Sequence, residues 1–242
     1  MNSTWVIAKR ELNSFFDSLM AYMMIIIFLG LSGFFTWLSS SSNVFLIGQA
    51  DMQVFFSISF WTLFFFIPAI TMRSLAEENR SGTIELLSTK PISDWNIVTG
   101  KFLSCLLLVG IAILCTIPYY WSVSSLGNVD HGAIIGGYFG LLLLSGMYIS
   151  IGIFASSITQ NQIVAFLLAL FIGIFFHILF DIIGSSQTGW TGALFNFLSA
   201  RSHFESISRG VVDTRDIFYF LSIIVLGLLL SQIMLSKRNW QD

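Results

Sequence analysis

Apolar runs without any charged residue alternate with short polar segments along this chain of 242 residues. Five charge-free intervals are prominent, with lengths of 33, 21, 28, 50 and 20 residues. A membrane-spanning helix needs about 20 predominantly apolar residues, so each interval can hold at least one span. The longest interval is interrupted by its most polar patch, from Ser156 to Gln162, and is long enough for two. The pattern predicts six spans.

The six spans are expected near the following residues: Leu19–Leu38, Val54–Thr71, Phe102–Val123, Gly136–Ser157, Ile163–Gly184 and Ile217–Ser236. They are expected to be helices, because backbone polar groups surrounded by lipid need internal hydrogen-bond partners. The alternating pattern of a membrane β-barrel is absent from the sequence. The predicted fold is an all-α integral membrane protein with a single transmembrane domain over residues 1–242.

The composition agrees with this class and excludes others. The chain is 55% hydrophobic and 10% charged, whereas about a quarter of the residues in a soluble domain are charged. The net charge of −2 and the lack of a basic cluster argue against a nucleic-acid partner. Cys105 and Cys115 lie ten residues apart in one apolar run, a spacing that predicts neither a disulfide framework nor a metal site.

Lysine and arginine are unevenly divided between the two sides of the predicted membrane. Six spans place both termini on one side, and that side carries eight of the eleven basic residues: Lys9, Arg10, Arg73, Arg80, Lys90, Lys101, Lys237 and Arg238. The other side carries Arg201, Arg209 and Arg215. Cytoplasmic loops are enriched in lysine and arginine, so both termini and the loop at 72–101 are predicted to be cytoplasmic.

Residues 1–18 have the pattern of an amphipathic helix. One face is apolar and holds Trp5, Leu12, Phe16 and Leu19. The opposite face is polar and holds Lys9, Asn13 and Asp17. This pattern favours a helix that lies in the membrane interface, and a plain cytoplasmic extension of the first span is the alternative.

The predicted external loop, residues 185–216, is long enough to contain structure of its own. Two short apolar helices with an apex at residues 200–202 would form a re-entrant hairpin in the outer leaflet, and a loop lying flat on the surface is the alternative. Ser202 and Glu205 fit a capping box, which predicts a helix from there to Gly210. The candidate residues of this loop are Arg201, Ser202, Glu205, Arg209 and Gly210.

His177 and Asp181 are ionisable residues four positions apart in the fifth predicted span. Ionisable residues within a span are candidates for a transport pathway or a proton relay. Asp181 lies close to the predicted outer boundary, however, and a structural contact between the two side chains across one helical turn is the alternative.

The longest charge-rich segment lies between the second and third spans, from Arg73 to Lys101. Within it, residues 83–88 can form a short helix that exposes Ile84, Leu86 and Leu87 beside Glu85. Apolar residues exposed on a cytoplasmic loop indicate a surface that a partner covers. No phosphate-binding loop is present in the sequence, so any ATP used would be bound by another chain.

Residues 77–93 resemble the signature of ABC-2 type permeases, and they lie at the same place in the topology. The residues that would couple to an ATPase are Glu78, Gly82, Thr83, Ile84, Glu85, Leu86, Leu87 and Pro91. The whole chain is similar to the gliding-motility-associated branch of this family. Residues 203–216 resemble the stretch that precedes the last span in that branch.

The resemblance implies a permease subunit of an ABC exporter in a bacterial inner membrane, with an interfacial helix, a coupling helix and re-entrant helices. Two permease halves, identical or related, would work with two ATPase subunits, which would hold ATP and Mg²⁺. This chain would have no cofactor and no enzymatic activity of its own, and an accessory membrane protein would be a further partner. Two other classes stay open: a scaffold that transmits motion from an ATPase without transport, and a membrane enzyme acting on lipid.

Overall fold

The computed structural model describes residues 3–38, 51–82 and 93–238, and within these ranges the regular structure is helical. Six helical segments are long and apolar enough to cross a membrane: Leu19–Leu38, Gln53–Ser81, Asp94–Ser124, His131–Ile158, Gln162–Ser186 and Thr214–Lys237. The prediction of six spans is confirmed. Most of the segments extend past the apolar runs, because polar residues such as Ser93 and Asp130 cap them at their ends.

The first half of the chain supplies three spans and the helices at their ends. These elements are α1 (Ser3–Asp17), α2 (Leu19–Gly33), the π-helical turn η1 (Phe34–Leu38), α4 (Gln53–Thr71), α5 (Ala76–Ser81), α7 (Asp94–Leu114) and α8 (Ile117–Ser124). The second half supplies α9 (His131–Ile158), α10 (Gln162–Ile174), the π-helical turn η2 (Phe175–Leu179), α11 (Phe180–Ser186), α12 (Trp190–Leu198), α13 (Ala200–Ser208) and α14 (Thr214–Arg238).

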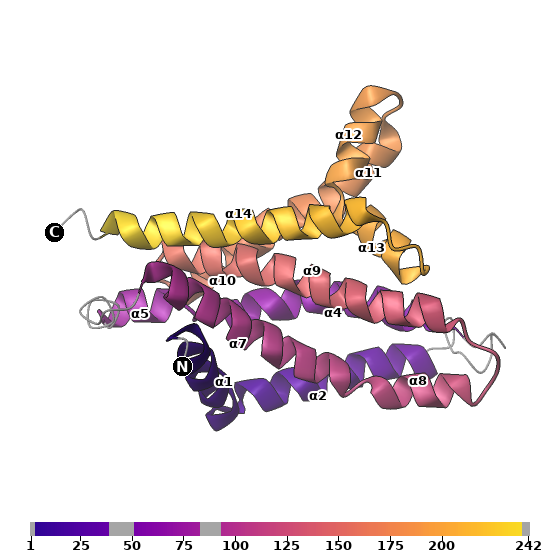
Figure 1. Ribbon diagram of the computed structural model, residues 1–242, viewed down its shortest axis with the longest axis horizontal. Coiled ribbons are helices and arrows are strands. Elements are labelled where there is room, and N and C mark those ends of the chain that lie inside the picture. Colours follow the sequence, from indigo (N-terminus) through magenta and orange to yellow (C-terminus); the bar gives the residue numbers. More distant parts are fainter. Residues whose placement is uncertain (1–2, 39–50, 83–92, 239–242) are drawn as a thin grey trace.

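The long helices run side by side, and the two ends of the bundle differ (Figure 1). One end, called the terminal end below, holds both chain termini, α1, α5 and the start of α7. The opposite end holds α8, α13 and the starts of α9 and α14. Both termini at one end is the arrangement expected for an even number of spans.

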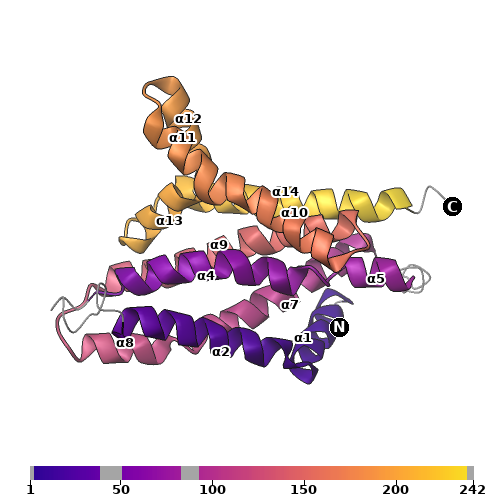
Figure 2. The ribbon, with the colours of Figure 1, turned by 180° about the vertical axis from the view of Figure 1, so that it is seen from behind.

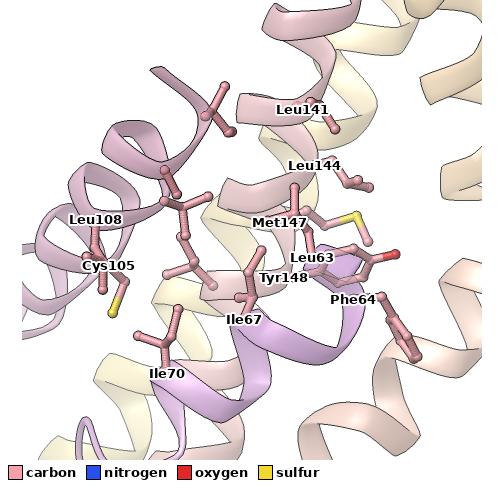
Figure 3. Close-up of a cluster of buried hydrophobic side chains, with 14 of the residues drawn as sticks. Leu63, Phe64, Ile67, Ile70, Cys105, Leu108, Leu141, Leu144, Met147 and Tyr148 are labelled. Atoms are coloured by element: carbon pink, nitrogen blue, oxygen red, sulfur yellow. The ribbon is translucent and has the colours of Figure 1, made fainter. Parts of the chain in front are cut away.

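Helix α9 is the centre of the bundle and packs against α4, α7, α10, α13 and α14. Apolar side chains of α4 and α7 meet those of α9 around Tyr148 and Met147 (Figure 3). Glycines on α9 allow a close approach: a Cβ at Gly136 would lie 2.5 Å from the carbonyl oxygen of Ile207 in α13. The small residues Gly136 and Gly140, four positions apart, therefore serve helix packing within the chain.

Helix α1 packs across α7 at the terminal end. Its fully buried residues are Ile7 and Ala8, whereas Trp5 is about half exposed, at 48%. The helix predicted at the N-terminus is thus present, but the face that packs on the protein includes residues outside the expected apolar stripe. Trp5 stays on the outer surface, and its placement in a membrane interface stays a prediction.

The segment before the last span contains helices, but they pair differently from the predicted hairpin. Helix α12 packs against α11, and together they project from the side of the bundle (Figure 2). Helix α13 turns back and packs on α9 instead. The two short helices are present with a break at Ser199, but they pack mainly on α11 and α9 and little on each other. Their re-entry into the outer leaflet stays a prediction.

Candidate functional site

The coupling segment predicted between the second and third spans is described only at its start. Thr83, Ile84, Glu85, Leu86, Leu87 and Pro91 lie outside the described residues. Helix α5 leads directly into this segment and ends at Gly82, whose φ of +69° is the left-handed conformation that glycine adopts at a helix C-terminus. The left-handed Gly82 therefore ends α5 where the coupling segment begins.

The turn between α4 and α5 is fixed to the end of α9 by one serine. The Ser156 hydroxyl accepts hydrogen bonds from the backbone N–H groups of Leu75 and Ala76, at 3.0 and 2.9 Å, and donates to the Met72 carbonyl at 3.1 Å. Backbone N–H groups at a helix start have no partner within the helix, so this buried hydroxyl satisfies two of them. The start of α5 is held firmly against the central helix.

A buried ion pair ties α5 to α7. Lys101 of α7 is only 2% exposed, and its Nζ lies 2.7 Å from Glu78 Oε1 of α5. Glu11 of α1 lies 3.7 Å from the same Nζ, and Arg10 lies 2.8 Å from Glu11 and 4.0 Å from Glu78. These four residues, called the charge cluster below, join three helices at the terminal end.

The charge cluster connects the start of the coupling segment to α1 and α7. Glu78 is four residues before Gly82, where the segment begins. A lysine buried in an apolar helix is stable only with partners, so the ammonium group holds α5 and α1 in fixed positions on α7. A displacement of the segment would therefore reach α1 and α7 through charged contacts, and α9 through Ser156.

His177 lies deep in the bundle, in the π-helical turn η2, and is 1% exposed. Its ring stacks between Phe60 and Phe64 of α4, at centroid distances of 4.1 and 4.3 Å. Nδ1 lies 2.6 Å from the Tyr148 hydroxyl, while Nε2 has no hydrogen-bond partner among the described residues. A buried polar atom without a partner costs about 1–3 kcal/mol, and π-helical turns are frequent at functional sites.

Asp181 has a different partner from His177. Its carboxylate lies 3.6 Å from the Arg201 guanidinium of α13. The alternative contact between His177 and Asp181 across one helical turn is absent among the described residues, because His177 pairs with Tyr148 of α9 instead. The two residues do not form one polar cluster, which removes the feature that favoured a lipid-acting enzyme.

The charged residues of α13 form a ladder along one face of the helix. Arg201 Nε lies 2.7 Å from Glu205 Oε1, and Arg209 Nη2 lies 3.3 Å from Glu205 Oε2. The hydrogen bond to Glu205 raises the pKa of the Arg201 guanidinium. Because Glu205 is held by two arginines, it does not act as the second half of a capping box.

The start and end of α13 are set by other residues. Ser199, and not Ser202, is the N-cap, and its side chain accepts from the backbone N–H of Ser202 at 3.4 Å. The Ser202 hydroxyl instead donates to the carbonyl of Asn196 at 2.7 Å. The predicted start is therefore three residues late. Gly210, with φ of +87°, follows the end of the helix as predicted.

Comparison with protein families identifies the membrane domain. The model of the ABC-2 family transporter proteins matches residues 5–199, which include α1, the charge cluster and the spans up to α12. The chain belongs to the ABC-2 transporter family. No individual curated protein matches it. The family's transmembrane subunits are permeases of ABC transporters, and the six apolar helices agree with a multi-pass permease.

The permease also contains a buried polar contact that sequence reasoning missed. His203 of α13 places Nδ1 2.6 Å from Asp216 Oδ1 of α14, and Nε2 2.8 Å from the carbonyl of Phe197. Both ring nitrogens therefore lie within hydrogen-bond distance of an oxygen from a neighbouring segment. The ring stacks on Tyr219 at 4.1 Å. This contact anchors α13 of the permease to its last span.

A signal for the charge cluster was present in the sequence. Lys101 falls in register with Ile97, Ser104 and Leu108, all on the buried face of α7. A charged residue on a buried stripe requires a partner of opposite charge. The identity of that partner could not be read, because Glu11 and Glu78 come from helices that are distant in sequence. In the part of the permease that the structure describes, no group of three metal-ligating residues occurs.

Proposed function

We propose that this permease is driven by a separate ATPase, which binds residues 83–88 at the terminal end on the cytoplasmic side. The observation that supports this most is the ion pair between Glu78 and Lys101, because it ties the helix before the segment to the membrane domain. The match to the transporter family and the missing phosphate-binding loop agree with a partner that supplies ATP and Mg²⁺.

The proposed mechanism follows from the contacts of α5. Closure of two ATPase subunits around ATP would press on residues 83–88, and α5 would pass the movement on. The Glu78–Lys101 pair would carry it to α7, and Ser156 would carry it to α9. Because α5 also continues α4 in one helical segment, the second span would move with it.

The proposal includes a second permease half, identical or related, and transport out of a bacterial cytoplasm across the inner membrane. Helices α2 and α10 bury few of their apolar residues within the chain, which leaves surface for lipid or another half. His177 and Asp181 stay candidates for the pathway. The likeness of residues 203–216 to the gliding-motility-associated permeases supports a role in surface motility, which deletion of the gene in a gliding bacterium would test.

Substitution within the coupling segment tests the proposal. We expect Leu86→Asp to remove the co-purifying ATPase or its stimulation, because a carboxylate cannot enter an apolar groove. The matched control is Leu126→Asp, since Leu126 is exposed at the opposite end. Unchanged ATPase association with Leu86→Asp would refute the proposal. The scaffold class would be favoured instead if the ATPase binds and is stimulated through residues 83–88 but no substrate moves into proteoliposomes.

A further inference from the structure

A cavity of about 600 Å³ lies at the terminal end, beside the charge cluster. Residues of α1, the start of α2, the end of α4, α5 and α7 line it. Three cationic and three anionic side chains face it, so its lining carries no net charge: Arg10, Arg73, Lys101, Glu11, Glu77 and Glu78. Such a lining does not select an ion of one sign.

Two of the six charges have no ion-pair partner among the described residues. Lys101, Glu78, Glu11 and Arg10 are engaged with one another in the charge cluster. Arg73 contacts the sulfur of Met20 at 3.9 Å, and no carboxylate of the described residues lies within ion-pair distance of its guanidinium. The Glu77 side chain likewise has no ion pair in the described part of the chain. Arg73 and Glu77 are both exposed and are four residues apart.

As far as the structure describes the chain, the cavity therefore presents a cation and a carboxylate without ion-pair partners to the same space. Glu78 can accept a further hydrogen bond, because its Oε2 has no donor among the described residues. A zwitterion that carries an anion and an N–H donor a few ångströms apart would satisfy both exposed groups. A ligand with only negative charge would be opposed by Glu77 and Glu78.

The position of the cavity indicates where such a ligand would come from. Met20 and Ile70 also line it, and both belong to spans. Directly beyond Met20, α2 exposes an apolar surface that includes Tyr22, Met23 and Ile26. The cavity thus lies where polar surface gives way to the surface that acyl chains contact, which is the level of phospholipid headgroups.

We propose that this cavity binds the phosphoethanolamine headgroup of a membrane phospholipid. The phosphate lies against Arg73, whose guanidinium can donate two parallel hydrogen bonds to it. The ammonium group donates to Glu77, and the acyl chains follow the exposed face of α2. A choline headgroup lacks N–H donors, and a glycerol headgroup lacks the positive charge. The proposal does not depend on ATPase coupling.

The test measures lipid binding to the purified full-length chain by native mass spectrometry in detergent. Three vesicle-derived lipids with matched acyl chains compete for the protein: phosphatidylethanolamine, phosphatidylcholine and phosphatidylglycerol. We expect the ethanolamine lipid to bind about tenfold more tightly than either competitor, the factor that about 1.4 kcal/mol of contact energy sets. Equal retention of the three lipids would overturn the proposal.

Variants and a soluble ligand locate the site and its source. The double variant Arg73→Gln/Glu77→Gln should lose the headgroup preference. Lys9→Gln/Asp17→Asn should keep it, because these exposed charges of α1 are outside the cavity lining. A preference that survives the first double variant contradicts the site. Binding of free glycerophosphoethanolamine as tight as that of the lipid would assign the cavity to a soluble ligand and overturn the lipid source.

Discussion

Lys101 is the most buried of the described charged residues at the terminal end. Its ammonium group is almost fully buried, while the carboxylates of Glu78 and Glu11 that face it are 16% and 21% exposed. A buried ion pair adds little net stability compared with apolar residues, but the loss of one partner leaves an uncompensated charge. The cluster therefore fixes position more than it adds to the free energy of unfolding.

We expect Lys101→Met to destabilise the permease, because Glu78 and Glu11 lose the charge that neutralises them. Breaking a buried pair costs about 3–5 kcal/mol, and partial exposure of the carboxylates favours the lower end. The change is read as a lower midpoint of thermal unfolding in detergent.

Two further variants separate this effect from a general loss of charge. Lys9→Met should change the midpoint little, because Lys9 is exposed. Lys101→Met combined with Glu78→Gln should recover part of the loss, since no unpaired charge of that pair remains. The two residues would not be coupled if the double variant lowers the unfolding midpoint by the sum of the changes that Lys101→Met and Glu78→Gln each cause alone.

At the scale of elements, the spans followed from the apolar runs, whereas the pairing of the short helices did not. The six spans can be recognised in the sequence because the bilayer requires each of them to be apolar and long enough to cross it. Helices α11, α12 and α13 are short, with 7, 9 and 9 residues, so each has too little surface for its sequence to say which helix it pairs with. Contact is decided by shape, as at Gly136 and Ile207, where the backbones of α9 and α13 approach closely. The π-helical turn η2 was likewise not visible from residue spacing.

Gly136→Ala should weaken the docking of α13 on α9. The added methyl group would overlap the Ile207 carbonyl oxygen, and overpacking of this kind costs about 1–3 kcal/mol. Gly30→Ala in α2 is the matched control, because a Cβ there meets nothing within 4 Å. We expect a lower thermal midpoint for the first variant and an unchanged or higher one for the second. The opposite order would contradict the packing described for α13.

At the scale of the whole molecule, the distribution of charge predicts the orientation of the permease. The terminal end collects most of the basic residues and, with them, the start of the coupling segment. An ATPase that works in the cytoplasm can reach residues 83–88 only if this end is cytoplasmic. Charge counting thus predicts the side, whereas contacts such as Glu78–Lys101 are needed to connect the start of that segment with the bundle.

Cysteine labelling in intact cells checks this orientation. In a Cys115→Ser background, which removes the exposed cysteine, Asn128→Cys should react with an impermeant maleimide added outside. Asn13→Cys should react only after the cells are opened, because α1 lies at the terminal end. Both positions are exposed, so access to the reagent differs only by side. The reverse labelling pattern would invert the topology.

Photocrosslinking from the coupling segment tests most directly whether an ATPase drives this permease through residues 83–88. A photoreactive amino acid at Leu86, with Asn128 as the control position, is activated in native membranes, and the crosslinked proteins are identified by mass spectrometry. We predict that Leu86 yields an ATPase with a phosphate-binding loop, that ATP changes the yield, and that Asn128 yields no such product. An ATPase captured from neither position, or equally from both, would contradict the account.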